Sequence, residues 1–308
     1  GELFVATTMK KDTVASNRLG QDALRFIIAT PICDGHDVAA AAITRLLRKQ
    51  GVDAIYLGFN KSVKQIVKAV VEEDASAIAL STYNGGHMSF IRELLKELRR
   101  QGVAHIPLFC GGGGTILARE VAPLERMGVA KVYRPPLDLG DAIADMVART
   151  ESLSSTSQPK MAPRGFGLIA KDLTNVNLDV TEAIGRQQDT GSPPVVWGFN
   201  GRGGAGKSTL IDELLSRFLE KCSGLVAVLS LDPTLGDRLR MLYCYSPRVY
   251  LRSVRLGPND NLDKELASRI KVLREGGFDL ILVESVGLGQ NDLGVIPYVD
   301  AAVFCLTP

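Results

Sequence analysis

Residues 201–208 read Gly-Arg-Gly-Gly-Ala-Gly-Lys-Ser, and this segment constrains the fold more than any other part of the chain. It fits G-x-x-x-x-G-K-[ST] at every fixed position, after the apolar run Val195 to Phe199 and before the amphipathic stretch Ser208 to Lys221. A glycine-rich turn between a strand and a helix surrounds phosphate groups with backbone N–H groups, and the helix N-terminus adds partial positive charge. The pattern therefore predicts a phosphate-binding loop in a parallel α/β domain.

The side chains of this loop indicate nucleotide chemistry. Lys207 supplies a mobile cation to the β- and γ-phosphates, and the Ser208 hydroxyl is a ligand for magnesium. The remaining nucleotide-binding positions are Gly201, Gly203, Gly204, Ala205, Gly206 and Thr209. Asp232 and Glu284 follow later apolar runs, so they are candidates for binding magnesium or positioning water. A solvated acid at a strand end is the alternative for each.

A second ligand-binding pattern, Asp34-Gly35-His36, follows the apolar run Phe26 to Thr30. In open α/β sheets, ligands bind at the carboxyl ends of the strands. In a corrinoid site an imidazole can displace the cofactor's own base and bind cobalt, while a nearby carboxylate fixes its tautomer. Ser81 ends another run and could bind the displaced tail, and Gly112 and Gly113 would permit close backbone approach. By itself, His36 could equally be an ordinary loop histidine.

The rest of the chain divides around these two motifs. Apolar runs alternate with amphipathic stretches from residue 25 to about 150, which predicts a flavodoxin-like domain with five parallel strands. Serine, threonine and proline interrupt the periodicity at residues 151–163, and a short helical piece is expected at residues 173–184. We expect an N-terminal extension (1–24), a first domain (25–150), a linker with a short helix (151–190) and a phosphate-loop domain (191–308).

Composition excludes several other classes of protein. The 36 Lys and Arg residues nearly balance the 34 Asp and Glu residues, so a broad surface for nucleic acid or membrane is not expected. Apolar runs are too short to span a bilayer, and the N-terminus lacks a signal-peptide pattern, which predicts a cytoplasmic protein. The five cysteines are scattered, so we expect buried, reduced thiols instead of disulfides or a zinc site.

Further motifs in the second domain resemble the G-protein chaperones of adenosylcobalamin-dependent mutases. They are Asp232-Pro233, Leu235-Gly236-Asp237-Arg238 and the segment from Glu284 to Gln290, Glu-Ser-Val-Gly-Leu-Gly-Gln. The resemblance implies magnesium-binding roles for Asp232, Asp237 and Glu284, and catalytic roles for Asp237 and Glu284 beside Lys207. It also implies GTP in place of ATP. This choice depends on the resemblance alone, because the base-selecting Asn-Lys-x-Asp motif is expected after Leu306 and the given sequence ends at Pro308.

The first domain resembles base-off, histidine-on cobalamin domains, and Ser81-Thr82-Tyr83-Asn84-Gly85-Gly86-His87 is similar to the version in fused isobutyryl-CoA mutases. The resemblance implies that His36 binds cobalt and that Asp34, Ser81, Gly112 and Gly113 bind the cofactor. Ala39 and Tyr83 depart from the generic motif. His87 and His105 are not assigned to the metal: His105 reads as a surface residue, and His87 either lines the cofactor face or begins a helix.

Together the two resemblances imply the adenosylcobalamin-binding, GTP-hydrolysing portion of a fused isobutyryl-CoA mutase. The GTPase domain would gate cofactor loading, and the acyl-CoA would bind a separate substrate domain in the same full-length chain or a partner subunit, within a homodimer. A stand-alone cobalamin carrier and a corrinoid methyltransferase component are the alternatives. A receiver-like signalling domain would need a second carboxylate where His36 stands.

Overall fold

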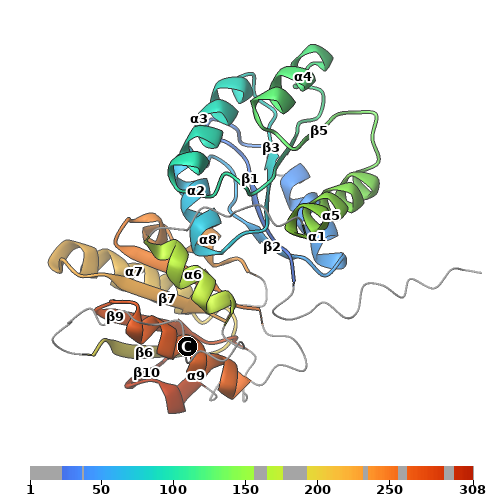
Figure 1. Cartoon of the computed structure of the whole chain (residues 1–308). Helices are drawn as coiled ribbons and strands as arrows, with labels where there is room; N and C mark the ends of the chain where they lie inside the picture. Colours follow the sequence, from blue (N-terminus) through green and yellow to red (C-terminus); the bar gives the residue numbers. More distant parts are fainter. Residues whose placement is uncertain are drawn as a thin grey trace, which may run out of the picture.

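The computed structural model describes residues 23–36, 38–155, 165–175, 193–231, 235–255, 262–287 and 295–307. They form two separate five-stranded sheets, and all the strands in each sheet run parallel (Figure 1). Each sheet has apolar clusters that pack its helices against its faces. The α/β fold class predicted from the sequence is therefore confirmed.

The first sheet has the strand order β2-β1-β3-β4-β5 that is typical of flavodoxin-like domains. Its order reverses between β1 and β3, so the carboxyl ends of these two strands form the crevice where such folds bind ligands. The elements in chain order are β1 (Arg25–Ala29), α1 (Val38–Lys49), β2 (Asp53–Tyr56), α2 (Val63–Glu72), β3 (Ala77–Ser81), α3 (His87–Arg100), β4 (Leu108–Gly111), α4 (Ala118–Met127), β5 (Lys131–Tyr133) and α5 (Leu139–Ser155).

Helix α2 shows how local sequence sets an element that later matters for the site. Ser62 is its N-cap: the Ser62 hydroxyl accepts a hydrogen bond from the Gln65 N–H, and the Gln65 side chain accepts one from the Ser62 N–H. This reciprocal arrangement satisfies two backbone donors that a helix start leaves free. Ile66, Val67 and Val70 then face the core, so α2 is fixed against the sheet over its whole length.

The second sheet has the order β10-β6-β9-β7-β8. One of its edge strands, β8, was not predicted, because Arg252 interrupts a short run that carries no clear alternation. The elements are α6 (Phe166–Thr174), β6 (Val195–Asn200), α7 (Lys207–Lys221), β7 (Val226–Ser230), α8 (Asp237–Arg240), the 3₁₀ helix η1 (Tyr243–Tyr245), β8 (Val249–Ser253), α9 (Leu262–Glu275), β9 (Leu280–Glu284) and β10 (Ala301–Phe304).

The segment between the sheets differs from the prediction. Helix α5 continues to Ser155, five residues into the predicted linker, where the Ser154 hydroxyl donates to the Thr150 carbonyl one turn earlier. The helix expected at residues 173–184 is instead α6, which ends at Thr174, and residues 176–192 lie outside the described part of the chain. Phe166 of α6 packs against the rings of Tyr250 and Phe278, so α6 belongs to the second domain.

Two expectations from composition can be compared with the structure. Within the described ranges, no helix is both long and apolar enough to cross a bilayer. The expectation of buried thiols is correct for Cys110, Cys244 and Cys305, whereas it is wrong for Cys33 and Cys222, which are exposed. Both exposed cysteines lie outside the helices and strands, where no neighbouring element covers them.

Candidate functional site

The Asp34-Gly35-His36 loop lies at the carboxyl end of β1, beside the point where the strand order reverses. His36 Nδ1 lies 2.8 Å from Asp34 Oδ1, and the His36 N–H donates to the same oxygen at 3.1 Å. The Asp34 side chain is fully buried, whereas the His36 side chain is 65% exposed. Since the carboxylate accepts from Nδ1–H, the Nε2 lone pair is the one left to bind a metal from the solvent side.

Tyr83 completes the shell around Asp34, and the sequence did not single it out as a site residue. Its backbone N–H donates to Asp34 Oδ2 at 2.5 Å, and its ring centroid lies 5.2 Å from that of His36. Burial alone would raise the pKa of Asp34, but the hydrogen bonds from Tyr83 and His36 outweigh it and hold this pKa below its usual value. Asp34 therefore stays a carboxylate and fixes the imidazole tautomer.

A cavity of about 260 Å³ opens beside this loop, between the carboxyl ends of β3 and β4. Ser81, Tyr83, Gly112 and Gly113 line it, together with apolar side chains that include Ala79, Phe109, Leu139 and Met146. The cavity thus combines an apolar wall with backbone and hydroxyl groups at one end, as sites for heterocyclic ligands do. Three of the predicted cofactor-binding residues, Ser81, Gly112 and Gly113, meet here.

The two predicted glycines have a structural task that the sequence did not reveal. A Cβ atom at Gly112 would lie 1.7 Å from the Thr82 carbonyl oxygen, and one at Gly113 would lie 2.4 Å from Tyr83 Cε1. No side chain fits at Gly112, where the clash is with backbone, whereas at Gly113 the Tyr83 ring would have to move; glycine at 112 is therefore needed to bring the loop after β4 against the loop after β3. The close approach that we expected toward a ligand is first an approach between the two walls of the cavity.

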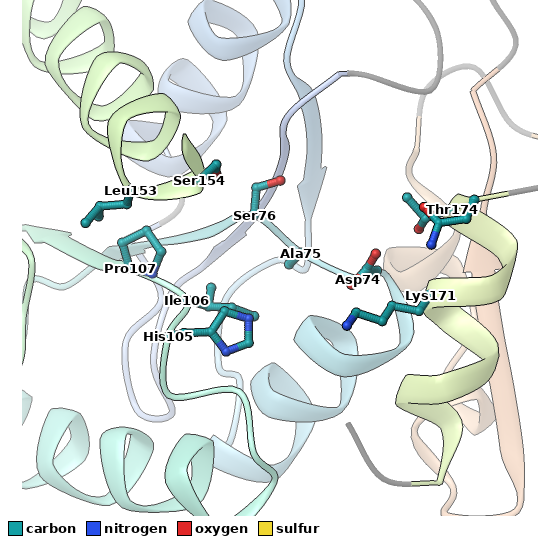
Figure 2. A pocket seen from close by; sticks show the side chains of 11 residues that line it. Asp74, Ala75, Ser76, His105, Ile106, Pro107, Leu153, Ser154, Lys171 and Thr174 are labelled. Atoms are coloured by element: carbon teal, nitrogen blue, oxygen red, sulfur yellow. The ribbon is translucent and has the colours of Figure 1, made fainter. Parts of the chain in front are cut away.

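The other two histidines, His87 and His105, do not lie at the His36 site. His87 is buried as the first residue of α3, with Nε2 3.1 Å from Glu120 Oε2 and Nδ1 3.3 Å from the Asn84 carbonyl. It therefore begins a helix and connects α3 to α4, which resolves the two readings of this residue. His105 is exposed, as predicted, and contributes to a larger cavity of about 410 Å³ at the amino ends of β3 and β4 (Figure 2). That cavity is at the opposite edge of the sheet from His36.

In the second domain, the phosphate loop connects β6 to α7 as predicted. Gly206 is the N-cap of α7 in the left-handed region, and Gly201 also has a positive φ, with the position of a Cβ only 2.3 Å from the Cys305 carbonyl oxygen. These conformations favour glycine, which explains the spacing of the motif. Lys207 is 7% exposed, and its Nζ donates to the carbonyls of Gly201 at 2.7 Å and Arg202 at 3.2 Å.

Ser208 and Glu284, predicted separately, lie in direct contact. The Ser208 hydroxyl donates to Glu284 Oε1 at 2.6 Å, and the Ser230 hydroxyl donates to Glu284 Oε2 at 3.3 Å. The carboxylate is nearly buried, at 4% exposed. Hydroxyl and carboxylate oxygens are the ligands that hard divalent cations prefer, so these two side chains could bind one such cation together, directly or through water.

The remaining two acidic candidates have different outcomes. Asp232 lies outside the described residues. Asp237, the first residue of α8, is fully buried; its Oδ2 accepts from the Ser253 hydroxyl at 3.5 Å and its Oδ1 accepts from Arg240 at 2.8 Å. Across the described ranges, no group of three His, Cys, Asp or Glu side chains converges as a ready metal site.

Known proteins match both domains in this order. The B12 binding domain family matches residues 24–136, and the methylmalonyl-CoA mutase-associated GTPase MeaB family matches residues 177–308. Fused isobutyryl-CoA mutase from Cupriavidus metallidurans is 34% identical over 326 residues, which are 98% of this chain and 30% of that protein. Fused isobutyryl-CoA mutase from Geobacillus kaustophilus is 34% identical over 313 residues, or 92% of this chain and 29% of that protein.

Part of the chain also matches a mutase with a different name. Ethylmalonyl-CoA mutase from Cereibacter sphaeroides is 36% identical over 133 residues, covering 43% of this chain and 20% of that protein. The chain spans about 30% of the length of the fused mutases that it matches. Through both domains and their order, it belongs to the family of the fused isobutyryl-CoA mutases, as a B12-binding domain followed by a MeaB-type GTPase domain.

Proposed function

We propose that this chain is the adenosylcobalamin-binding and GTP-hydrolysing part of a mutase that interconverts isobutyryl-CoA and n-butyryl-CoA. Its GTPase domain would gate the loading of the cofactor. The observation that carries the proposal is the exposed His36 ring held by buried Asp34 beside a cavity lined with glycine. This arrangement is what a cobalt ligand and a slot for a displaced nucleotide tail require.

In this proposal the first domain holds and orients the cofactor. His36 Nε2 would bind cobalt, and the Asp34 carboxylate would keep Nδ1 protonated and increase the basicity of the imidazole. Ser81, Gly112 and Gly113 would line the slot for the tail. When bound, the cofactor would supply the radical chemistry.

The second domain would bind GTP with magnesium. Lys207 Nζ now contacts two carbonyls of its own loop, and it would exchange them for the β- and γ-phosphates. Ser208 and Glu284 would share the cation, with Asp232 and Asp237 as further ligands. Hydrolysis would follow from charge neutralisation and positioning by Lys207, Asp237 and Glu284, because phosphoryl transfer needs little covalent help from the protein.

The acyl-CoA substrate would bind a separate substrate domain, in the same full-length chain or a partner subunit, and the assembly would be a homodimer in the cytoplasm. The names of the fused relatives favour isobutyryl-CoA, and the similarity of the first domain to ethylmalonyl-CoA mutase supports a branched acyl-CoA more generally. A stand-alone cobalamin carrier is the second candidate, since the His36 loop and its cavity lie within the first domain and could hold the cofactor without the phosphate loop.

One experiment tests both halves of the proposal. The protein is mixed with adenosylcobalamin, and its absorbance spectrum and its release of phosphate from GTP and from ATP are measured. We expect a spectrum of histidine-bound cobalamin that His36→Ala abolishes, and GTP hydrolysis that Lys207→Ala abolishes. Each variant serves as the control for the other site. A protein that binds no corrinoid would refute the cofactor assignment, and corrinoid binding without nucleotide turnover would favour the carrier.

A further inference from the structure

A short segment of the GTPase domain is buried in the B12-binding domain. Leu235 is 1% exposed, and it belongs to the apolar cluster formed by α2, α3 and the first sheet. Helix α8 follows at once. Its Leu239 Cδ2 lies 2.7 Å from the position of a Cβ atom at Gly58, after β2. Since Gly58 has a φ of +91°, glycine is favoured there by both its backbone conformation and its neighbour.

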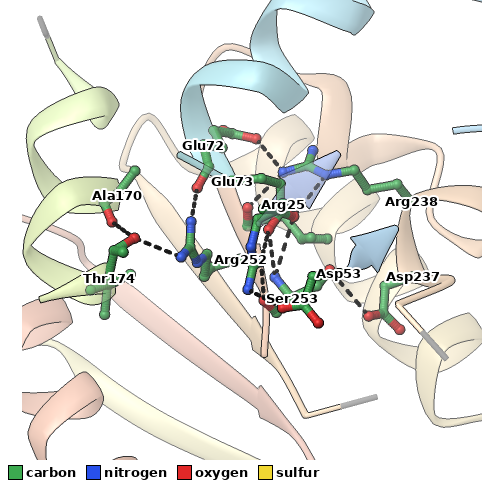
Figure 3. Close-up of polar contacts among 12 residues, drawn as sticks. Arg25, Asp53, Glu72, Glu73, Ala170, Thr174, Asp237, Arg238, Arg252 and Ser253 are labelled. Carbon is green, nitrogen blue, oxygen red and sulfur yellow. Dashed lines mark hydrogen bonds and ion pairs between the residues drawn. The ribbon is translucent and has the colours of Figure 1, made fainter. Parts of the chain in front are cut away.

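Arg238 fixes this segment in place. Its side chain is fully buried; Nε donates to Glu73 Oε1 at 3.0 Å and Nη2 donates to Glu72 Oε2 at 3.0 Å, both at the end of α2 (Figure 3). Nη2 also donates to the Leu251 carbonyl of β8 at 2.7 Å. One guanidinium thus connects the two domains, and α8 has little freedom to move independently of α2.

The second carboxylate oxygen of Glu73 connects Arg238 to further residues of both domains. Glu73 Oε2 accepts from Arg25 at 2.8 Å, and Arg25 also donates to the Ser253 carbonyl at 2.8 Å. The Ser253 hydroxyl in turn donates to Asp237 (Figure 3). These groups form a buried polar network that involves β1, α2, α8 and β8, so a shift of Asp237 would be felt in both domains.

On one side, α8 leads to the nucleotide site. Ser253 and Glu284 lie level with Ser230 in the strand register, at the carboxyl ends of β8 and β9. Glu284 contacts Ser208 of the phosphate loop, and Asp237 contacts Ser253. The start of α8 therefore lies at the same sheet edge as the phosphate loop, where a bound nucleotide and its cation change the local charge.

On the other side, α8 leads to the cobalt-ligand loop. The loop after Gly58 is bonded to that loop: the Asn60 N–H donates to the Asp34 carbonyl at 3.3 Å, and Asn60 Oδ1 accepts from the Cys33 N–H at 3.0 Å. The Lys61 N–H donates to the Thr30 carbonyl at 3.0 Å, and Lys61 and Pro31 pair as an isolated parallel β-bridge. A displacement of Gly58 would therefore be passed through these hydrogen bonds to the backbone that carries Asp34 and His36.

We propose that α8 is a positioning element that transmits the nucleotide state of the GTPase domain to the His36 loop, through the contact of Leu239 with Gly58. Arg238 is its fixed point, and Asp237 is its nucleotide-facing end. This inference depends on the proposed function, since it concerns how the two sites of that function are coupled. Leu239 itself is 47% exposed and contacts neither ligand in the proposed mechanism, so its effect would be indirect.

The test uses Leu239→Ala in the full chain, with Leu242→Ala as the matched control. Leu242 is a leucine three positions later that is 74% exposed. For each protein, the dissociation constant and the absorbance spectrum of adenosylcobalamin are measured without nucleotide, with GDP and with a non-hydrolysable GTP analogue. Binding of a fluorescent GDP is measured in parallel, so that loss of nucleotide affinity is detected separately.

Allosteric couplings typically change affinity by about 5- to 150-fold, and we expect the nucleotide to change cobalamin affinity within this range in the wild type and Leu242→Ala, but by less than about 2-fold in Leu239→Ala. Leu239→Ala should keep its affinity for fluorescent GDP and its histidine-bound spectrum. Full coupling in Leu239→Ala, or binding of both ligands by the wild type without any coupling, would overturn the inference and leave the proposed function intact. A wild type that fails to bind either ligand would remove the proposed function, and the inference with it.

Discussion

Replacing the buried Arg238 by methionine should destabilise the folded protein strongly. The guanidinium makes three hydrogen bonds of 2.7 to 3.0 Å, and its side chain and those of Glu72 and Glu73 are at most 1% exposed. Methionine fills a similar volume but leaves two buried carboxylates without this partner. Breaking a buried ion pair from one side costs about 3 to 5 kcal/mol in the free energy of unfolding.

The structure favours the lower end of that range. Glu72 keeps an ion pair with Lys68, and Glu73 keeps Arg25 and the Ser253 N–H. We therefore expect a loss of about 3 kcal/mol at neutral pH. In urea this corresponds to a midpoint lowered by roughly 1 M or more, because the dependence on urea is about 1 to 3 kcal/mol/M. Trp197 fluorescence reports the second domain, and circular dichroism reports both.

The pH dependence gives a sharper test. Burial raises the pKa of Glu72, while Lys68 and Arg238 partly counteract this rise. Without Arg238 the folded-state pKa of Glu72 should rise further above its unfolded value. The variant should therefore be closest to the wild type below the unfolded pKa of about 4.3, and the gap should widen as the pH rises through the folded-state pKa.

Arg217→Met is the matched control, because Arg217 forms an exposed pair with Glu213 and its loss should change stability by less than about 0.5 kcal/mol. A loss below about 1 kcal/mol for Arg238→Met at neutral pH, where breaking a buried pair is expected to cost more, would show that the interdomain pair is not closed in solution. A loss that stays constant from acid to neutral pH would refute the assignment of the deficit to unpaired carboxylates.

Three other outcomes follow from the same structure. Gly112→Ala should prevent the loops after β3 and β4 from meeting, because its Cβ would lie 1.7 Å from the Thr82 carbonyl oxygen; we expect loss of cobalamin binding with GTP hydrolysis unchanged, and retained binding would refute the steric argument. Glu284→Gln should weaken magnesium affinity by about 10- to 100-fold, seen as a higher magnesium concentration needed for half-maximal binding of fluorescent GDP. An unchanged magnesium concentration would exclude Glu284 from the metal shell. Iodoacetamide at neutral pH should modify the exposed thiols and spare the buried ones, since burial raises the pKa of both Cys110 and Cys244 to about 12; peptide mass spectrometry would contradict this if either were modified in the native protein.

The sequence by itself predicted two ligand-binding motifs and the fold around them, and the fold is confirmed. Local patterns can be recognised from neighbouring residues alone, without distant contacts. They include the phosphate loop, the Asp34-Gly35-His36 loop and the alternation of apolar runs. Helix α7 begins within one residue of the amphipathic stretch Ser208 to Lys221, and Ser208 and Glu284 converge because both lie at the carboxyl edge of one parallel sheet. Topology alone was enough to bring these residues together.

Only the tertiary structure decided how the two domains are joined. Arginine in a sequence predicts a solvated side chain, and burial of Arg238 requires carboxylates at Glu72 and Glu73, more than 160 positions away. Strand β8 was missed for a related reason, because its burial depends on β7 beside it and on the polar network that accommodates Arg252. The free energy of such groups depends on partners that no local pattern encodes, so the contact of Leu239 with the loop after β2 becomes visible only in the folded protein.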